Sequence, residues 1–292
     1  TNENISSLRS HFPKLKIIQR GELFKVLGEK KSLNDFNKKF KYLTNYYLEF
    51  NSLNPHVIDE IIFNDIRYNG NYKSSLILHG VGGKPILAKT KNQKLLVDML
   101  NKKQLVFAIG PAGTGKTYCS AGTVAQLFMK GKYKKIVLTR ANVPTGKSLG
   151  HFPGTVAEKM TPWLMPMLEV LGKAFGKGKY EYMLNKGEIE IQPIETIRGR
   201  SYENALVLVD EAQNLNMDEL KAITTRLGEN SKLVLMGDPA QSDVKQGKDL
   251  VRFCYKVNKA GIKLPIIQFG VDDIVRSDIV ADLVRMFIEE EL

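Results

Sequence analysis

The sequence contains only two cysteines, and none of its apolar runs reaches the ~20 residues of a membrane-spanning helix. Cys119 and Cys254 show no paired spacing, so we expect plain structural thiols in a reducing compartment. The first ten residues lack the apolar core of a secretory signal peptide. Apolar and charged fractions of 43% and 25% are those of an ordinary globular protein. These features predict a soluble, cytoplasmic protein.

Acidic residues are scarce in the first two thirds of the chain, and the net charge of +12 is therefore unevenly distributed. Residues 1–104 carry 18 Lys and Arg against 9 Asp and Glu, and residues 130–186 carry 11 against 3. Residues 187–292 reverse the balance, with 13 against 19. Clustered cations neutralise phosphates, so the pattern favours a polyanionic partner, above all nucleic acid. A solvated lysine-rich surface is the alternative interpretation.

Short apolar runs alternate with helical stretches from residue 93 onward. Most runs are nearly continuous, as expected for parallel strands that are covered on both faces. The alternation predicts an α/β fold with an open, mostly parallel sheet, which binds ligands at the carboxyl ends of its strands. We expect strands at 105–109, 136–139, 189–192, 205–209, 233–236 and 266–269.

The segment before this alternation has a different pattern. Two strands, at 15–18 and 22–27, and a helix over 33–50 predict a small N-terminal α/β unit. Residues 51–92 contain several turn-forming pairs and are typical of a linker around short elements. We therefore predict two domains, over residues 1–84 and 85–292.

A glycine-rich segment directly follows the expected strand at 105–109. It reads Gly-Pro-Ala-Gly-Thr-Gly-Lys-Thr over residues 110–117, which matches the phosphate-binding loop of P-loop NTPases. The glycines allow successive N–H groups to point at a phosphate, and the following helix favours negative charge at its N-terminus. Lys116 is expected to reach the β- and γ-phosphates, and the Thr117 hydroxyl is expected to hold Mg²⁺. A glycine-rich turn that binds nothing is the alternative.

Two adjacent acids end the expected strand at 205–209. In P-loop enzymes the first, here Asp210, would hold Mg²⁺, and the second, Glu211, would polarise the attacking water. The next strand ends in Gly-Asp-Pro-Ala-Gln, and the amide of Gln241 could sense the γ-phosphate and orient water. Solvated acids and an ordinary Gly-Asp-Pro turn are the alternatives.

Three arginines are candidates for stabilising the charge that develops during phosphoryl transfer: Arg140, Arg226 and Arg276. Arg140 ends the strand at 136–139, and Arg276 follows the last expected strand. Spacing alone does not choose among them. Arg276 could instead pair with Asp272, Asp273 or Asp278.

Together these motifs resemble the PhoH-like family of phosphate-starvation-inducible P-loop ATPases, over roughly residues 85–292. The resemblance is carried by the phosphate loop, by Asp-Glu-Ala-Gln-Asn at 210–214, and by Asp-Ile-Val-Arg at 273–276. Further matching segments are 146–154, 158–163, 198–202, 225–228 and 237–241. The chain departs from the family pattern at Ala141, where family members often have proline, and at Lys147, where they often have an acidic residue.

The resemblance implies a RecA-like core similar to the first domain of superfamily 1 helicases, with ATP and Mg²⁺ as cofactors. It makes Asp210 and Glu211 the Walker B pair, Gln241 the γ-phosphate glutamine, Gln93 an adenine contact and Arg276 a γ-phosphate contact. It also makes the N-terminal unit similar to a KH-type piece, although no G-x-x-G clamp is present. The expected catalytic residues are Lys116, Glu211, Gln241 and Arg276; the metal ligands are Thr117 and Asp210; the nucleotide contacts are Gln93, Gly110, Pro111, Ala112, Gly113, Thr114, Gly115, Lys116, Thr117 and Tyr118.

Sixteen residues follow Arg276, too few for a second RecA-type domain of ~100 residues. We therefore expect a homo-oligomeric ring, such as a hexamer, or an ATP-dependent switch without unwinding. Three functions remain open. The first is an ATPase or helicase that acts on RNA or single-stranded DNA, the second an ATP-gated regulatory or scaffold protein, and the third a kinase-like phosphotransferase. The Asp-Glu-Ala-Gln string favours activation of water over transfer to a metabolite.

Overall fold

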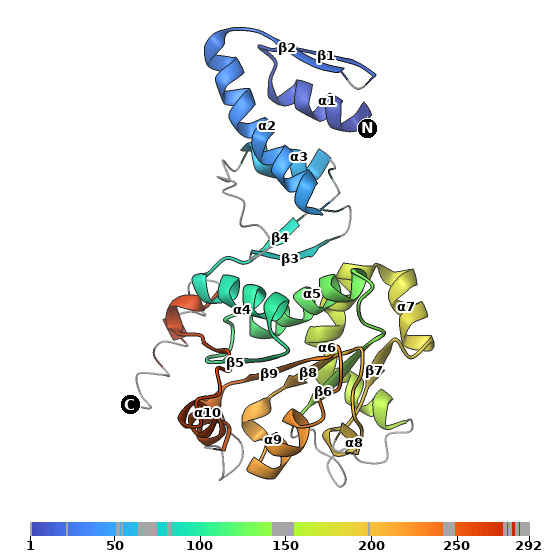
Figure 1. Cartoon of the computed structure of the whole chain (residues 1–292), viewed down its shortest axis with the longest axis vertical. Coiled ribbons are helices and arrows are strands. Elements are labelled where there is room, and N and C mark those ends of the chain that lie inside the picture. The colour runs from blue at the N-terminus through green and yellow to red at the C-terminus, as the bar shows by residue number, and fades with distance from the viewer. Residues whose placement is uncertain are drawn as a thin grey trace. The chain divides into compact units, whose positions relative to one another are not determined.

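The chain divides into two compact units, Thr1–Ile86 and Leu87–Leu292, in a computed structural model (Figure 1). The predicted division into domains at residue 84 stays a prediction, because compactness does not show independent folding. The structure describes residues 2–21, 23–50, 53, 55–63, 75–80, 83, 85–141, 155–197, 199–241, 249–276, 279, 282–283 and 286.

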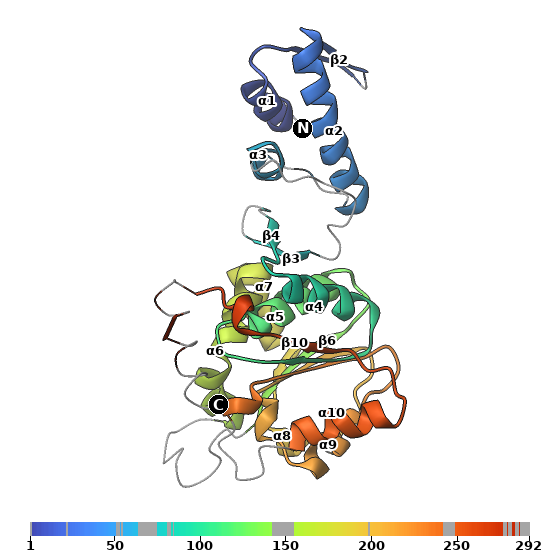
Figure 2. The same ribbon diagram turned by 90° about the vertical axis from the view of Figure 1, so that its left-hand side faces the viewer.

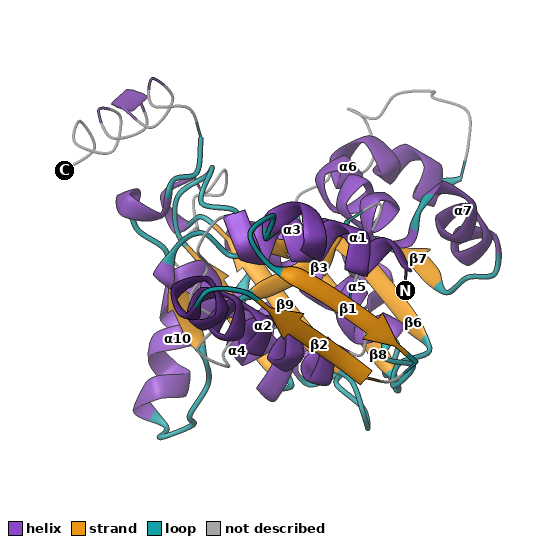
Figure 3. Ribbon diagram, turned by 90° about the horizontal axis from the view of Figure 1, so that it is seen from above, coloured by secondary structure: helices purple, strands orange, loops and turns teal. Residues whose placement is uncertain are grey.

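The N-terminal unit contains an antiparallel pair of strands, β1 and β2, which lie side by side in Figure 3. Phe12, Phe24, Phe36 and Phe40 pack their rings together between this pair and helix α2. The predicted strand pair and helix are confirmed, whereas the similarity to a KH-type piece stays a prediction. Helix α1 was not predicted, because its mostly polar sequence offers little periodicity. The elements are α1 (Asn2–His11), β1 (Lys16–Arg20), β2 (Leu23–Leu27), α2 (Lys30–Phe50), α3 (Pro55–Phe63), β3 (Leu76–His79) and β4 (Pro85–Leu87).

The second unit is built on a parallel sheet in the order β10-β5-β9-β8-β6-β7. The predicted α/β fold with a parallel sheet is confirmed, and each predicted strand is found within two residues of its expected ends. Every residue of β8 and β9 is buried, which explains their uninterrupted apolar sequences. The strands are β5 (Leu105–Ile109), β6 (Lys135–Arg140), β7 (Ile189–Ile191), β8 (Ala205–Asp210), β9 (Lys232–Gly237) and β10 (Ile266–Gln268).

Helices cover both faces of this sheet. Helices α4 and α5 lie on one face, and α9 and α10 lie on the other, as Figures 1 and 2 show. Helix α6 packs against α5, and α7 packs against α6. Among the described helices, none combines the length and apolarity that a membrane crossing requires. The helices are α4 (Lys91–Lys102), α5 (Lys116–Met129), α6 (Val156–Phe175), α7 (Lys177–Asn185), α8 (Ile194–Ile197), α9 (Met217–Thr224) and α10 (Asp249–Lys259).

Helix α6 has a strong start and an interrupted middle. The Thr155 side chain accepts a hydrogen bond from the Glu158 N–H, and the Glu158 carboxylate accepts one from the Thr155 N–H, which closes a capping box. Pro162 and Pro166 lie inside the helix. Each proline removes one intrahelical hydrogen bond, so the turn around residues 162–166 is held less firmly than the rest.

Candidate functional site

The glycine-rich loop connects β5 to α5 and has a backbone that only glycine adopts readily. Gly110, Gly113 and Gly115 have φ angles of 141°, 80° and 83°. A Cβ atom at Gly110 would lie 2.3 Å from the carbonyl oxygen of Phe269, next to β10. The loop is therefore packed against its neighbours in a shape that a side chain would disrupt.

Lys116 begins α5 and is turned back over the loop. Its ammonium donates hydrogen bonds to the carbonyl oxygens of Gly110 and Pro111, at 2.5 and 2.7 Å. The side chain is buried, and burial lowers its pKa below the ordinary value, although Asp238, Asp210 and Glu211 oppose that shift. The structure thus places a buried cation directly against the backbone of the glycine-rich loop.

The two acids at the end of β8 face this cation. Asp210 is buried, and burial, followed by the charge of Glu211, raises the pKa of its carboxyl. The Thr117 hydroxyl lies 3.4 Å from the Asp210 carboxylate. Glu211 has a φ of 52°, a strained left-handed conformation that turns the chain directly after the strand.

Hydroxyl and carboxylate oxygens are the ligands that Mg²⁺ prefers, so Thr117 and Asp210 fit that ion. Among the described residues, no group of three or more His, Cys, Asp or Glu could hold a metal by itself. Two protein ligands are what a magnesium site requires when substrate phosphates and water complete the coordination. The donor set therefore suits Mg²⁺ bound together with a nucleotide.

Gln213 connects the acids to the next strand and was not predicted as a site residue. Its amide group donates to the Glu211 carboxylate at 2.5 Å, and its carbonyl oxygen accepts from the Asp238 N–H at 2.9 Å. Gln213 is buried, with 2% of its surface exposed. It fixes Glu211 relative to the end of β9. Its place in the Asp-Glu-Ala-Gln string was the signal that could have pointed to it.

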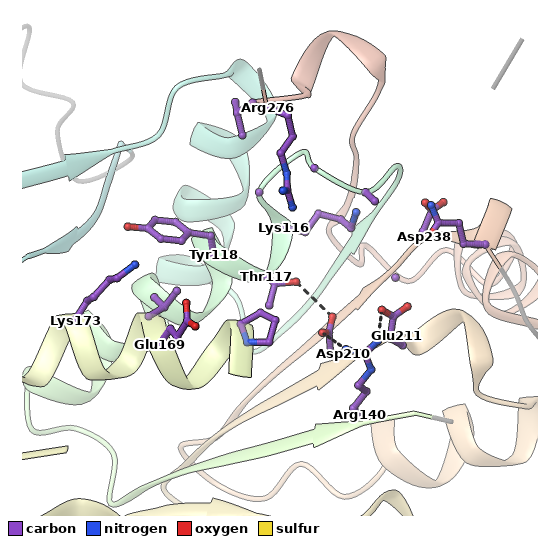
Figure 4. A pocket seen from close by; sticks show the side chains of 18 residues that line it. Lys116, Thr117, Tyr118, Arg140, Glu169, Lys173, Asp210, Glu211, Asp238 and Arg276 are labelled. Atoms are coloured by element: carbon purple, nitrogen blue, oxygen red, sulfur yellow. Dashed lines mark hydrogen bonds and ion pairs between the residues drawn. The ribbon is translucent and has the colours of Figure 1, made fainter. Parts of the chain in front are cut away.

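The glycine-rich loop, Lys116 and the two acids line a cavity of about 490 Å³, within the range of ligand pockets. Figure 4 shows Arg276 on one side, directed toward Lys116, and Arg140 on the other, next to Asp210 and Glu211. The predicted residues that line the cavity are Ala112, Gly113, Gly115, Lys116, Thr117, Tyr118, Asp210, Glu211, Gln241 and Arg276.

Helix α6 supplies a wall of the cavity that the sequence analysis missed. Pro166, Glu169, Val170 and Lys173 line it. Figure 4 shows Glu169 and Lys173 next to Tyr118. The helical pattern of α6 predicts a helix but does not show which other element its polar side chains meet. Its contribution to the cavity could therefore not be read from the sequence.

The three candidate arginines occupy different positions. Arg140 and Arg276 line the cavity, whereas Arg226 does not. The Val275 N–H donates to the Gly113 carbonyl at 3.0 Å, which holds Arg276 against the loop. Within the described residues Arg276 forms no ion pair with an acid, and Asp278 lies outside them.

Gln93 lies behind the loop rather than among the residues that line the cavity. Its carbonyl oxygen accepts from the Lys89 N–H at 2.8 Å, and its amide group donates to the Thr114 carbonyl at 3.0 Å. Only 3% of its surface is exposed. The predicted adenine contact stays a prediction. Three predicted features lie outside the described residues: the segment 146–154 with Lys147, Arg198 and Asp278.

The parallel sheet, with the glycine-rich loop after β5 and the acid pair after β8, defines a P-loop NTPase fold of RecA-like type. The family model described as "PhoH-like protein" matches residues 85–288. The chain therefore belongs to the PhoH-like family, as the sequence motifs indicated.

Curated relatives are consistent with this assignment. A PhoH-like protein of Bacillus subtilis is 36% identical over 225 residues, covering 77% of this chain and 70% of the relative. A PhoH-like protein of Synechocystis is 30% identical over 294 residues, covering 94% and 89%. Protein PhoH of Escherichia coli is 36% identical over 200 residues, covering 66% of this chain and 55% of the relative.

Solved structures are more distant. The large terminase of a thermophilic bacteriophage is 14% identical with a TM-score of 0.43, covering 67% of this chain and 49% of that one. The UvsW helicase of bacteriophage T4 is 13% identical with a TM-score of 0.41, covering 88% and 100%. Both scores are too low to add to what the sheet topology shows.

Proposed function

We propose that this protein binds ATP with Mg²⁺ in the cavity and hydrolyses it. The observation that carries the proposal is the buried Lys116 at the crown of a glycine-rich loop, facing Asp210 and Glu211 across one cavity. Loop N–H groups and the start of α5 bind phosphate oxygens, and Lys116 neutralises the β- and γ-phosphates. Thr117 and Asp210 hold Mg²⁺, which neutralises further phosphate charge when bound.

The remaining cavity residues act on the attacking water and on the developing charge. Glu211 orients the water and accepts its proton, and Gln241 positions the water relative to the γ-phosphate. Arg276 neutralises charge that builds up on the phosphoryl oxygens. Hydrolysis rather than phosphoryl transfer to a metabolite is favoured, because a carboxylate that can polarise water already stands in the cavity.

Two substitutions test this assignment. Lys116→Ala removes the loop cation, so both ATP affinity and turnover should fall. Glu211→Gln keeps the shape and the contact to Gln213, so ATP should still bind while turnover falls by ~10²–10⁴. Glu195→Gln, at an exposed position of α8, is the matched control. Normal turnover by Glu211→Gln would refute the assignment.

We further propose that RNA or single-stranded nucleic acid is the partner. The basic stretch 130–186 includes all of α6 and α7, in which 40% of Trp163 and 54% of Tyr182 are exposed. The Lys186 ammonium lies 5.6 Å from the Tyr182 ring centre. Exposed rings among lysines suit base stacking along a charged backbone.

The test is binding of a labelled single-stranded RNA across a salt series. Tyr182→Ala should weaken binding, because one stacked base is worth ~1–3 kcal/mol. Tyr255→Ala, at an exposed ring on α10, is the control and should change nothing. Affinity should fall steeply with salt. No binding at low salt would instead favour the ATP-gated regulatory or scaffold protein.

We propose a homo-oligomeric ring, and Arg276, which lines the cavity of its own subunit, tests whether neighbouring subunits share catalytic groups. Arg276→Ala should leave ATP affinity nearly unchanged and reduce turnover by ~10³–10⁵. If the arginine acts on a neighbouring subunit, mixing Arg276→Ala with Lys116→Ala protein restores part of the activity. If mixing restores none, the arginine acts within its own subunit and this support for a ring is lost. Arg252→Ala, at an exposed arginine on α10, is the control.

A further inference from the structure

Arg140 makes the densest set of contacts among the charged side chains of the cavity, and the proposed hydrolysis does not use it. It is the last residue of β6. Its guanidinium donates to the Glu211 carboxylate at 2.9 Å and lies 3.9 Å from the Asp210 carboxylate. Figure 4 shows it next to both acids. Arg140 is thus the counter-ion of the acid pair, since Lys116 is turned toward loop carbonyls.

The same guanidinium also holds helix α6. It donates to the Trp163 carbonyl oxygen at 3.0 Å, and its central carbon lies 6.0 Å from the Trp163 ring centre. Trp163 lies between Pro162 and Pro166, each of which removes one intrahelical hydrogen bond. A carbonyl oxygen has two lone pairs, so the Trp163 carbonyl can accept from Arg140 in addition to a bond within the helix. Arg140 therefore links the acid pair to the least firmly held turn of α6.

Occupation of the site changes the charge that Arg140 experiences. Without nucleotide, two carboxylates attract one guanidinium. A divalent cation held by Asp210 and Thr117 would stand close to the same guanidinium, and like charges repel within a partly buried cavity. The cation would offset part of the attraction that fixes Arg140, while the phosphates would add negative charge at the loop. The contacts of Arg140 to the Trp163 carbonyl and ring would change with this balance.

We propose that Arg140 is a positioning residue that transmits nucleotide occupancy from the Asp210–Glu211 pair to helix α6. The proposal rests on the proposed binding of Mg²⁺-ATP in this cavity. It gives α6 a response to nucleotide, and α6 carries both a wall of the cavity and part of the basic stretch. Nucleotide binding in the cavity and the position of α6, with its part of the basic stretch 130–186, then depend on each other.

The chain contains its own probe, because Trp163 is its single tryptophan. The experiment records Trp163 fluorescence while Mg²⁺ and a non-hydrolysable ATP analogue are added, with binding of the analogue measured separately by calorimetry. We expect the emission of the wild-type protein to change in parallel with binding. In Arg140→Ala the analogue still binds and the emission change is lost.

Two further variants make the test specific. Arg140→Gln keeps hydrogen-bond donors but removes the charge, so it should also lose the emission change. Arg200→Ala, at an arginine outside the cavity, should keep it. Thermal unfolding followed by circular dichroism confirms that each variant is folded. If Arg140→Ala does not fold, the result for Arg140→Gln decides.

The outcomes separate this inference from the proposed function. If the analogue does not bind to the wild-type protein, the proposed function fails. If it binds without an emission change, or if the change persists in Arg140→Gln, the coupling through Arg140 is refuted. Loss of the cation should leave affinity for the analogue unchanged or raise it. A fall of more than about tenfold would show that Arg140 contacts the nucleotide directly, which also overturns the proposal.

Discussion

Gln93 either supports the phosphate loop or contacts the adenine base, and the substitution Gln93→Met separates these two roles. Gln93→Met keeps the length of the side chain and removes both hydrogen bonds. The bond to the Thr114 carbonyl is buried, and Thr114 itself is fully covered, so its loss leaves an unsatisfied acceptor that costs ~1–3 kcal/mol. The Lys89 N–H lies at an exposed residue that water can reach, which limits that loss to ~0.5–1.5 kcal/mol.

The summed destabilisation is about 1.5–4.5 kcal/mol, to be measured by denaturant unfolding. For a unit of this size each 1 kcal/mol lowers the melting temperature by ~2–4 °C, so the melting temperature should fall by roughly 3–18 °C. Gln104→Met is the matched control, because Gln104 is exposed directly before β5. It should change stability by less than about 0.5 kcal/mol.

Nucleotide selectivity then decides between the roles. If Gln93 supports the loop, affinity for ATP and GTP analogues should fall by the same factor, since both nucleotides use the same loop to bind their phosphates. If Gln93 contacts adenine, only the preference for ATP should be lost. A stability change below about 1 kcal/mol together with lost ATP preference would refute the supporting role.

Two further predictions concern the backbone of the loop and a buried lysine. Gly110→Ala should abolish nucleotide binding and destabilise the protein, because its Cβ would collide with the Phe269 carbonyl, whereas Gly172→Ala meets open space and should be tolerated in both assays. Burial lowers the pKa of Lys232 from its usual 10.5 to about 8, so the unfolded chain binds more protons than the folded one between these values. Stability should therefore rise as pH increases from 8 to 10.5, and Lys232→Met should lack this rise. The difference between the unfolding free energies of the wild-type protein and Lys232→Met should then increase with pH over this window. A difference profile that is flat over this window would contradict the cause given for the shift.

The strands and the phosphate loop could be predicted because their signals are local. Strands β5, β8 and β9 are mostly apolar, and the glycine-rich loop, the two acids and the Gly-Asp-Pro-Ala-Gln segment stand directly at their ends. The contacts of Gln93, Gln213 and Arg140 could not be predicted in the same way. Each joins a side chain to a backbone or carboxyl group on another element, and a one-dimensional pattern does not give the order of strands in a sheet.

The predicted adenine contact illustrates this limit. Motif resemblance placed Gln93 near the nucleotide, and the structure does place it against the loop, at Thr114. Its buried amide, however, is engaged by backbone groups on both sides. Helix α6 is a second case, because its sequence predicts a helix with two prolines but not that Pro166, Glu169 and Lys173 border the cavity.

Strand β9 stands between the strand that carries the phosphate loop and the strand that carries the acids. Neighbouring strands are about 4.7–4.9 Å apart, so this one strand separates the two halves of the site by about 10 Å. The Thr117 side chain, at the start of α5, lies 3.4 Å from the Asp210 carboxylate on the other side of this separation. Asp238, which is buried, directly follows β9 between them. The distance between the phosphate loop and the acids is therefore set in whole strands. Side-chain substitutions can reshape the lining of the cavity without changing that distance.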